Sequence, residues 1–149
     1  MPTLFKYLNI GNSYYMLELL QKDEFPNRYK CRRFNDQSIG ILINHAIAGF
    51  ANKEDAKLFM DLLWKQVENG NLSADYYSKA MDHYISWYEN HEKSLLGTTV
   101  FSEDFKTFQL NDVIDPEQLN ELRAKYWLGT IEQYCISTGF LLPKNYVSK

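Results

Sequence analysis

The stretch between Leu72 and Gly97 limits the fold more than any other, because its apolar side chains recur at the three- and four-residue steps of an α-helix. Ser73 is expected to cap its start, and Gly97 suits the left-handed residue that follows a helix. The apolar residues are spread over more than one face: Tyr76, Tyr77, Ala80, Met81, Tyr84, Ile85, Trp87, Tyr88 and Leu95. A helix of this kind must be packed on several sides. We therefore expect a central helix over residues 73–96.

Four further helices are expected around this centre, at 13–22, 36–50, 52–69 and 116–138. Asp36 and Asn52 are the candidate caps of the second and the third of them. The last has the clearest start signal, with Asp115 as its cap and Pro116 in the first helical position, and Gly139 is expected to follow its end. Very short connections separate the three middle helices, which predicts that they pack as antiparallel neighbours.

Two short stretches near the N-terminus have strand-like patterns. Leu4–Ile10 is aromatic and partly alternating, and Arg28–Phe34 alternates basic with apolar side chains. If both are strands, they pair as a small N-terminal sheet. Thr98–Ile114 has no helical period, and it holds either a strand near Thr98–Phe101 or a long packed loop. The expected fold is mostly α, with about five helices and a small β element at most; α+β is the alternative if the strands pair.

The composition is that of an ordinary folded protein, since 45% of the 149 residues are hydrophobic and 23% are charged. This length fits a single domain over residues 1–149. No signal peptide and no apolar run long enough for a membrane helix is recognisable. Cys31 and Cys135 do not form a C-x-x-C motif. We therefore expect a cytoplasmic protein with free thiols, not bound to a membrane.

Motifs of common catalytic and nucleotide-binding sites are absent, including G-x-x-x-x-G-K-[ST], G-x-G-x-x-G and G-x-S-x-G. His91 begins a pattern like H-E-x-x-H, but Leu95 stands where the second zinc ligand is required. Cys31 and His45 form a nucleophile–base pair only if the fold brings them within hydrogen-bond reach. No metal or cofactor is expected. The enzymatic alternative is a small enzyme with His45, His83 or His91 beside a carboxylate between helices.

A basic segment offers another alternative. The stretch Arg28–Phe34 combines cations with two aromatic residues, a mixture that holds single-stranded nucleic acid through phosphate contacts and base stacking. Its cations are Arg28, Lys30, Arg32 and Arg33. The run is short and the whole chain carries a net charge of −3, so nucleic-acid binding is the less favoured role.

An acidic segment gives the favoured functional hypothesis. Between Glu103 and Glu121 six acidic residues stand against one lysine, a local charge of −5, and two large aromatic residues follow. The predicted partner-binding residues are Glu103, Asp104, Asp112, Glu117, Glu121, Tyr126 and Trp127. Charge of one sign speeds association with an oppositely charged partner, and aromatic side chains serve as anchors. We expect a non-catalytic protein-binding factor, such as an inhibitor or an immunity-type protein, which docks onto a basic partner.

Overall fold

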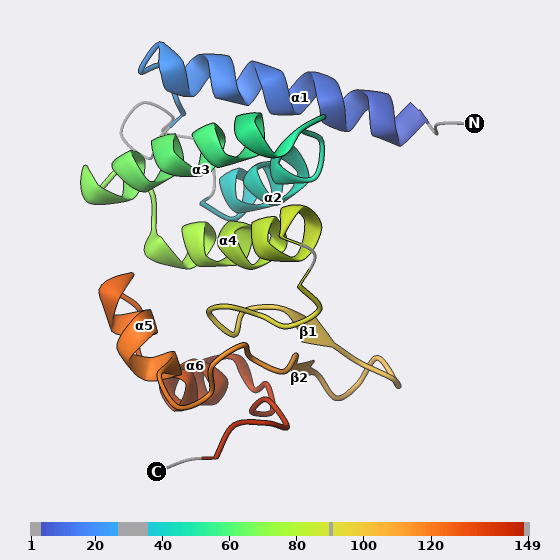
Figure 1. Ribbon diagram of the computed structural model, residues 1–149, viewed down its shortest axis with the longest axis vertical. Helices are drawn as coiled ribbons and strands as arrows, with labels where there is room; N and C mark the ends of the chain where they lie inside the picture. The colour runs from blue at the N-terminus through green and yellow to red at the C-terminus, as the bar shows by residue number, and fades with distance from the viewer. Residues whose placement is uncertain (1–3, 27–35, 90, 148–149) are drawn as a thin grey trace.

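The computed structural model describes residues 4–26, 36–89 and 91–147. This part of the chain holds six α-helices and one two-stranded antiparallel sheet (Figure 1). In chain order they are α1 (Leu4–Gln21), α2 (Asp36–Ile47), α3 (Lys53–Glu68), α4 (Ala74–Tyr88), β1 (Val100–Phe101), β2 (Gln109–Leu110), α5 (Leu119–Lys125) and α6 (Ile131–Thr138). The prediction of a mostly helical fold with a small β element is confirmed.

The first four helices form the larger of two cores, in which α1 and α4 each pack against both α2 and α3. In Figure 1, α1 lies at the top, α2 and α3 lie beneath it, and α4 lies below them. Helix α4 contacts both α2 and α3. The fully buried side chains of this core include Ile43, Ile47, Phe59, Leu63 and Ala80. Gly40 of α2 lies directly against the Tyr76 ring, where an added Cβ would be 2.3 Å from ring atom Cδ1. Glycine is therefore required for the close approach of α2 and α4.

Several helix ends follow the local signals in the sequence. Asn52 caps α3, because its Oδ1 accepts the backbone N–H of Asp55 at 2.8 Å. Ser73 caps α4 in the same way. Gly139 ends α6 in the left-handed region, with φ of +76°. Gly97 is also left-handed, with φ of +69°, but it lies in a loop after α4 and caps no helix.

The N-terminal strand prediction is wrong, because Leu4–Ile10 forms the first part of the continuous helix α1. A partly alternating run of seven residues does not distinguish a strand from a helix. Gly11 does not interrupt α1, although glycine in a helix costs about 1 kcal/mol relative to alanine. Burial of Met16, Leu17 and Leu20 further along α1 offsets that cost. The second predicted strand, at 28–34, lies outside the described residues.

The central helix is shorter than predicted, because α4 ends at Tyr88 and not at residue 96. The buried carboxylate of Asp82 explains this. It accepts the backbone N–H groups of Leu95, Leu96 and Thr98 at 2.7, 2.8 and 2.7 Å. Those amides would otherwise donate along a helix, so a buried acceptor on α4 draws the following chain into a loop.

The single helix predicted over 116–138 is two helices, α5 and α6. Trp127 is left-handed, with φ of +56°. Its N–H donates to the carbonyl of Ala124, and the N–H of Leu128 donates to that of Arg123, both at 3.0 Å. This pair of bonds is a Schellman motif, which terminates a helix. Tryptophan occupies the position that glycine usually takes, so the sequence contains no ordinary stop signal there.

The first of these helices begins later than predicted, and the second has a cap of its own. The Asp115 carboxylate caps a turn by accepting the N–H groups of Glu117 and Gln118, both at 3.1 Å, but α5 itself begins at Leu119. Helix α6 has a capping box, in which Thr130 and Gln133 each accept the other's backbone N–H.

The β element lies in the second half of the chain, where Thr98–Phe101 was one of the two expected positions. Strands β1 and β2 pair with Val100 opposite Leu110 and Phe101 opposite Gln109. On its other side, β2 is bridged at Gln109 by Leu141 of the C-terminal segment. Strand β1 is therefore the outer strand of the hairpin.

A second, smaller core lies beneath this hairpin and includes Leu110, Val113, Leu119, Ile131 and Cys135. The side chain of Arg123, only 2% exposed, connects it to the loop that follows α4. Its Nη1 donates to the Leu96 carbonyl at 2.6 Å, its Nε donates to the Gly129 carbonyl at 2.8 Å, and its guanidinium lies 5.2 Å from the Tyr134 ring centre. Asp82 and Arg123 thus hold the same loop from opposite sides and join the two cores.

Candidate functional site

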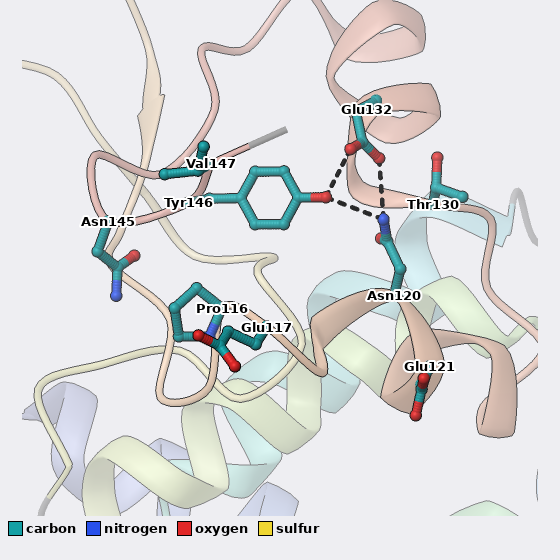
Figure 2. Close-up of a pocket in the computed structure, with 9 residues that line it drawn as sticks. All are labelled: Pro116, Glu117, Asn120, Glu121, Thr130, Glu132, Asn145, Tyr146 and Val147. Carbon is teal, nitrogen blue, oxygen red and sulfur yellow. Dashed lines mark hydrogen bonds between the residues drawn. The ribbon is translucent and has the colours of Figure 1, made fainter. Parts of the chain in front are cut away.

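A hollow lies between the turn before α5, helix α5, the start of α6 and the C-terminal segment (Figure 2). Its volume is about 740 Å³, within the range of ligand-binding clefts. It is lined by Pro116, Glu117, Asn120, Glu121, Thr130, Glu132, Asn145, Tyr146 and Val147. We call it the acidic hollow.

Three of the lining residues form a closed set of hydrogen bonds (Figure 2). The Tyr146 hydroxyl donates to Glu132 Oε1 at 2.5 Å. Asn120 Nδ2 donates to Glu132 Oε2 at 3.1 Å and to the Tyr146 oxygen at 3.0 Å. Asn120 is itself held by the backbone N–H of Ile131, which donates to its Oδ1 at 2.8 Å. The network ties the C-terminal segment to α5 and α6 at one wall of the acidic hollow.

This network lowers the pKa of Glu132. The hydrogen bond from Tyr146 is the main reason why the pKa of Glu132 falls to about 2, and the bond from Asn120 acts in the same direction. The pKa of Tyr146 rises to about 12, first because of burial and then because its hydroxyl donates to a carboxylate. At neutral pH the pair is therefore a carboxylate and a neutral phenol.

All the charged side chains that line the acidic hollow are negative. It contains the carboxylates of Glu117, Glu121 and Glu132, and none of the lining residues is a lysine or an arginine. Within the described residues, none of these glutamates has an ion-pair partner. An ammonium or guanidinium group is the chemical complement of such a site, since charge-assisted hydrogen bonds to carboxylates are among the stronger ones.

The seven predicted partner-binding residues lie in several elements of the second half of the chain. Glu117 and Glu121 line the acidic hollow. Glu103 and Asp104 lie in the loop of the β1–β2 hairpin, which projects on the side away from α5 (Figure 1). Asp112 follows β2, and its Oδ1 accepts the N–H of Asn145 at 3.2 Å, so this carboxylate has an internal role.

Tyr126 and Trp127, the two predicted aromatic anchors, pack against the first four helices. Their ring centres lie 5.3 and 5.2 Å from that of Trp64 in α3, and Tyr126 stacks on Tyr77 of α4 at 5.7 Å. Burial raises the pKa of the Tyr77 hydroxyl, and Tyr126 adds to this effect. Trp127 nevertheless remains 61% exposed. The cluster fixes the end of α5 onto α3 and leaves part of one indole at the surface.

Seven of the nine lining residues are not predicted from sequence, and five of these are polar: Asn120, Thr130, Glu132, Asn145 and Tyr146. Glu132 was placed in the interior of one long helix, although it lies in the first turn of α6. The pattern Thr130 to Gln133 is a capping-box signal that locates this start. No local signal pairs Tyr146 with Glu132, because that contact depends on how the C-terminal segment folds back.

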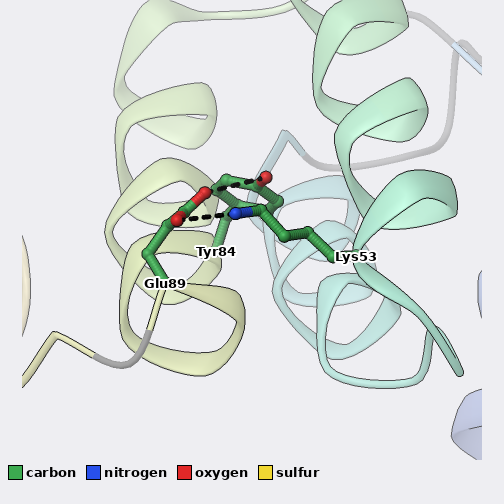
Figure 3. A network of polar contacts seen from close by, with 3 residues as sticks. All are labelled: Lys53, Tyr84 and Glu89. Atoms are coloured by element: carbon green, nitrogen blue, oxygen red, sulfur yellow. Dashed lines mark hydrogen bonds and ion pairs between the residues drawn. The ribbon is translucent and has the colours of Figure 1, made fainter.

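A separate polar network joins α3 to the end of α4 (Figure 3). Lys53 Nζ lies 2.7 Å from Glu89 Oε2, and the Tyr84 hydroxyl donates to Glu89 Oε1 at 3.3 Å. The hydrogen bond from Lys53 is the main reason why the pKa of Glu89 is lowered. This network links the start of α3 to the end of α4.

The histidines do not come together with a carboxylate in the described part of the chain. His45 is exposed on α2, His91 is exposed after α4, and His83 is half-buried on α4. Burial lowers the pKa of His83, Asp82 opposes that effect, and His45 adds to it. Within the described residues, no histidine is hydrogen-bonded to a carboxylate and no group of three or more potential metal ligands is found.

Of the two cysteines, only Cys135 lies within the described residues. Cys135 is a buried free thiol, and burial raises its pKa while Arg123 opposes the rise. Cys31 and the cations at 28–33 lie outside the described residues, so the nucleic-acid alternative stays a prediction.

Comparisons with protein-family models, with curated proteins and with solved structures give no match to this chain. Across the residues that the structure describes, no helix combines the length and the apolar character needed to cross a membrane.

Proposed function

We propose that this protein is a non-catalytic protein-binding factor that receives a basic segment of its partner in the acidic hollow. The observation that carries the proposal is a hollow of about 740 Å³ whose lining includes three glutamates and no cation. A small protein whose binding site carries only negative charge fits best as an inhibitor or an immunity-type protein.

The arrangement suits a lysine or arginine side chain that enters from a partner. Glu132 is oriented by Tyr146 and Asn120, so one carboxylate is held in place before binding. Glu117 and Glu121 also line the acidic hollow, and both are exposed. Pro116 and Val147 supply apolar surface for the aliphatic part of a long basic side chain.

The proposal is tested by titrating the full chain with an acetylated tetra-arginine amide peptide in a calorimeter. We expect binding that weakens at least several-fold between about 50 and about 300 mM salt, because exposed charges are screened. The double variant Glu117→Gln/Glu121→Gln should weaken it about tenfold, a loss of roughly 1.4 kcal/mol.

Glu24→Gln is the matched control, because Glu24 is an exposed glutamate outside the acidic hollow. This variant removes one negative charge outside the site, so it should bind the peptide about as tightly as the unchanged protein does. Equal weakening by the control and by the double variant would contradict the proposal, since the peptide would then respond to net charge alone.

A further inference from the structure

The β1–β2 hairpin and the segment beside it carry several apolar side chains that the fold leaves partly or largely exposed. They are Val100, Phe101, Phe105, Phe108 and, from the adjoining C-terminal segment, Leu141. Phe105 is the most exposed, at 86% of its surface. A cluster of this kind on a projecting element is typical of an interaction surface.

The tip of the hairpin holds Phe105 outward in an unfavourable backbone conformation. Its φ is +57°, a region that residues with a Cβ rarely adopt. The Asp104 carboxylate maintains this turn, because its Oδ1 accepts the N–H groups of Lys106 and Thr107 at 2.9 and 2.8 Å. A strained aromatic residue with almost no contacts of its own points to a role in binding.

A hollow of about 270 Å³ lies beside this cluster, on the hairpin itself. Phe101 and Leu141 form its apolar part, and Glu103, Asp104 and Lys144 are among its polar residues. A cavity of about 150 Å³ is enough to hold a benzene ring, so the hollow can accept a phenyl ring from another chain. The hairpin thus presents both an aromatic knob and a hollow of suitable size.

The charges of the hairpin favour a second copy of the chain as the occupant. Glu103 and Asp104 are balanced by Lys106 and by Lys144, whose Nζ lies 5.5 Å from the Phe101 ring centre. Because each copy has two carboxylates and two ammonium groups here, a two-fold rotation can set carboxylates of one copy opposite ammonium groups of the other, whereas a basic or an acidic partner would be repelled by half of the patch. The acidic hollow, with charge of one sign, has no such self-complementarity.

We infer that the protein forms a two-fold symmetric dimer through this hairpin. Phe105 of each copy occupies the hollow between Phe101 and Leu141 of the other copy, and Glu103 of each copy faces Lys144 of the other. The inference does not depend on the proposed function, because the acidic hollow lies on different elements.

The first test is sedimentation of the full chain under reducing conditions, at concentrations from about 5 to about 500 µM, the range in which small interfaces associate. We expect a reversible monomer–dimer equilibrium. Phe105→Asn should raise the dissociation constant at least about tenfold, because asparagine tolerates the left-handed turn but lacks the ring. Ile136→Asn is the control, since Ile136 is 84% exposed on α6, and it should leave the equilibrium unchanged.

The second test uses reversed charges and identifies the pairing. Glu103→Lys and Lys144→Glu each place like charges at both symmetric contacts, so each variant alone should remain monomeric. In an equimolar mixture of the two variants, both contacts again join opposite charges, and a heterodimer should form.

A chain that stays monomeric up to the highest concentration overturns the inference. It is also overturned if Phe105→Asn and Ile136→Asn dimerise equally, or if the mixed charge variants do not associate. Circular dichroism of every variant establishes that the helical fold is retained.

Discussion

Two single residues, Asp82 and Trp127, decide where helices end in this chain. Asp82 lies on α4 with 1% of its surface exposed, and its carboxylate accepts three backbone N–H groups of the following loop. Trp127 adopts the left-handed conformation that ends α5. Neither aspartate nor tryptophan is a residue type that usually marks a helix end. Asp82 accepts amides 13 to 16 residues further along the chain, and Trp127 stands where glycine is usual, so sequence patterns predict neither helix end, whereas they do predict the local caps Asn52 and Ser73.

Replacement of Asp82 tests the first of these roles. Both carboxylate oxygens of Asp82 accept hydrogen bonds, and Asp82→Asn replaces one of them with an N–H₂ group that donates, so the buried donors on that side lose their acceptor. We expect the free energy of unfolding in urea to fall by about 3 kcal/mol. Asp61→Asn changes an exposed aspartate of α3 and should alter it by less than about 1 kcal/mol. Similar values for the two variants would show that Asp82 does not organise the loop.

Two replacements of Trp127 separate backbone strain from packing. Both Trp127→Ala and Trp127→Gly lose the contact with the Trp64 ring at 5.2 Å. Only glycine adopts φ of +56° without strain, so the glycine variant should be more stable than the alanine variant by about 1 kcal/mol. Urea unfolding of both measures this difference. An alanine variant that equals or exceeds the glycine variant would argue against a strained helix end.

At the scale of elements, the acidic hollow depends on where α6 begins and on how the C-terminal segment meets it. Glu132 lies in the first turn of α6, and Tyr146 reaches it from the C-terminal segment. A carboxyl group whose pKa falls from 4.5 to about 2 on folding stabilises the fold above pH 4.5. That stabilisation is lost as the pH falls from about 4.5 towards 2, because protonation then favours the unfolded chain.

The Tyr146→Phe variant tests this element contact. Without the hydroxyl, the pKa of Glu132 should return towards its ordinary value, so the unfolding free energy should depend less on pH between 4.5 and 2 than it does in the unchanged protein. Urea unfolding at several pH values in this window measures the slope. Tyr15→Phe, at an exposed tyrosine of α1, is the control and should keep the original slope. An unchanged slope in Tyr146→Phe would mean that this tyrosine does not set the charge of Glu132.

At the scale of the whole molecule, the sequence predicted the fold better than the site. Helical periodicity is a property of neighbouring residues, so the four helices α1–α4 were largely recognised, apart from the first part of α1. The acidic segment was recognised as well, but its charges serve different purposes in the structure. Asp104 maintains the hairpin tip and Asp115 caps a turn, whereas Glu117 and Glu121 line the acidic hollow. Such a division depends on the folded chain.

The acidic hollow is tested most directly by mapping where a basic ligand binds. The measurement is a ¹H–¹⁵N NMR titration of the full chain with the tetra-arginine peptide. We expect the amide signals of Asn120, Glu121, Glu132 and Tyr146 to shift together with one dissociation constant, while that of Phe105 at the hairpin tip stays in place. Shifts spread evenly over all acidic surfaces, or confined to residues away from α5 and α6, would contradict the assignment of this hollow as the binding site.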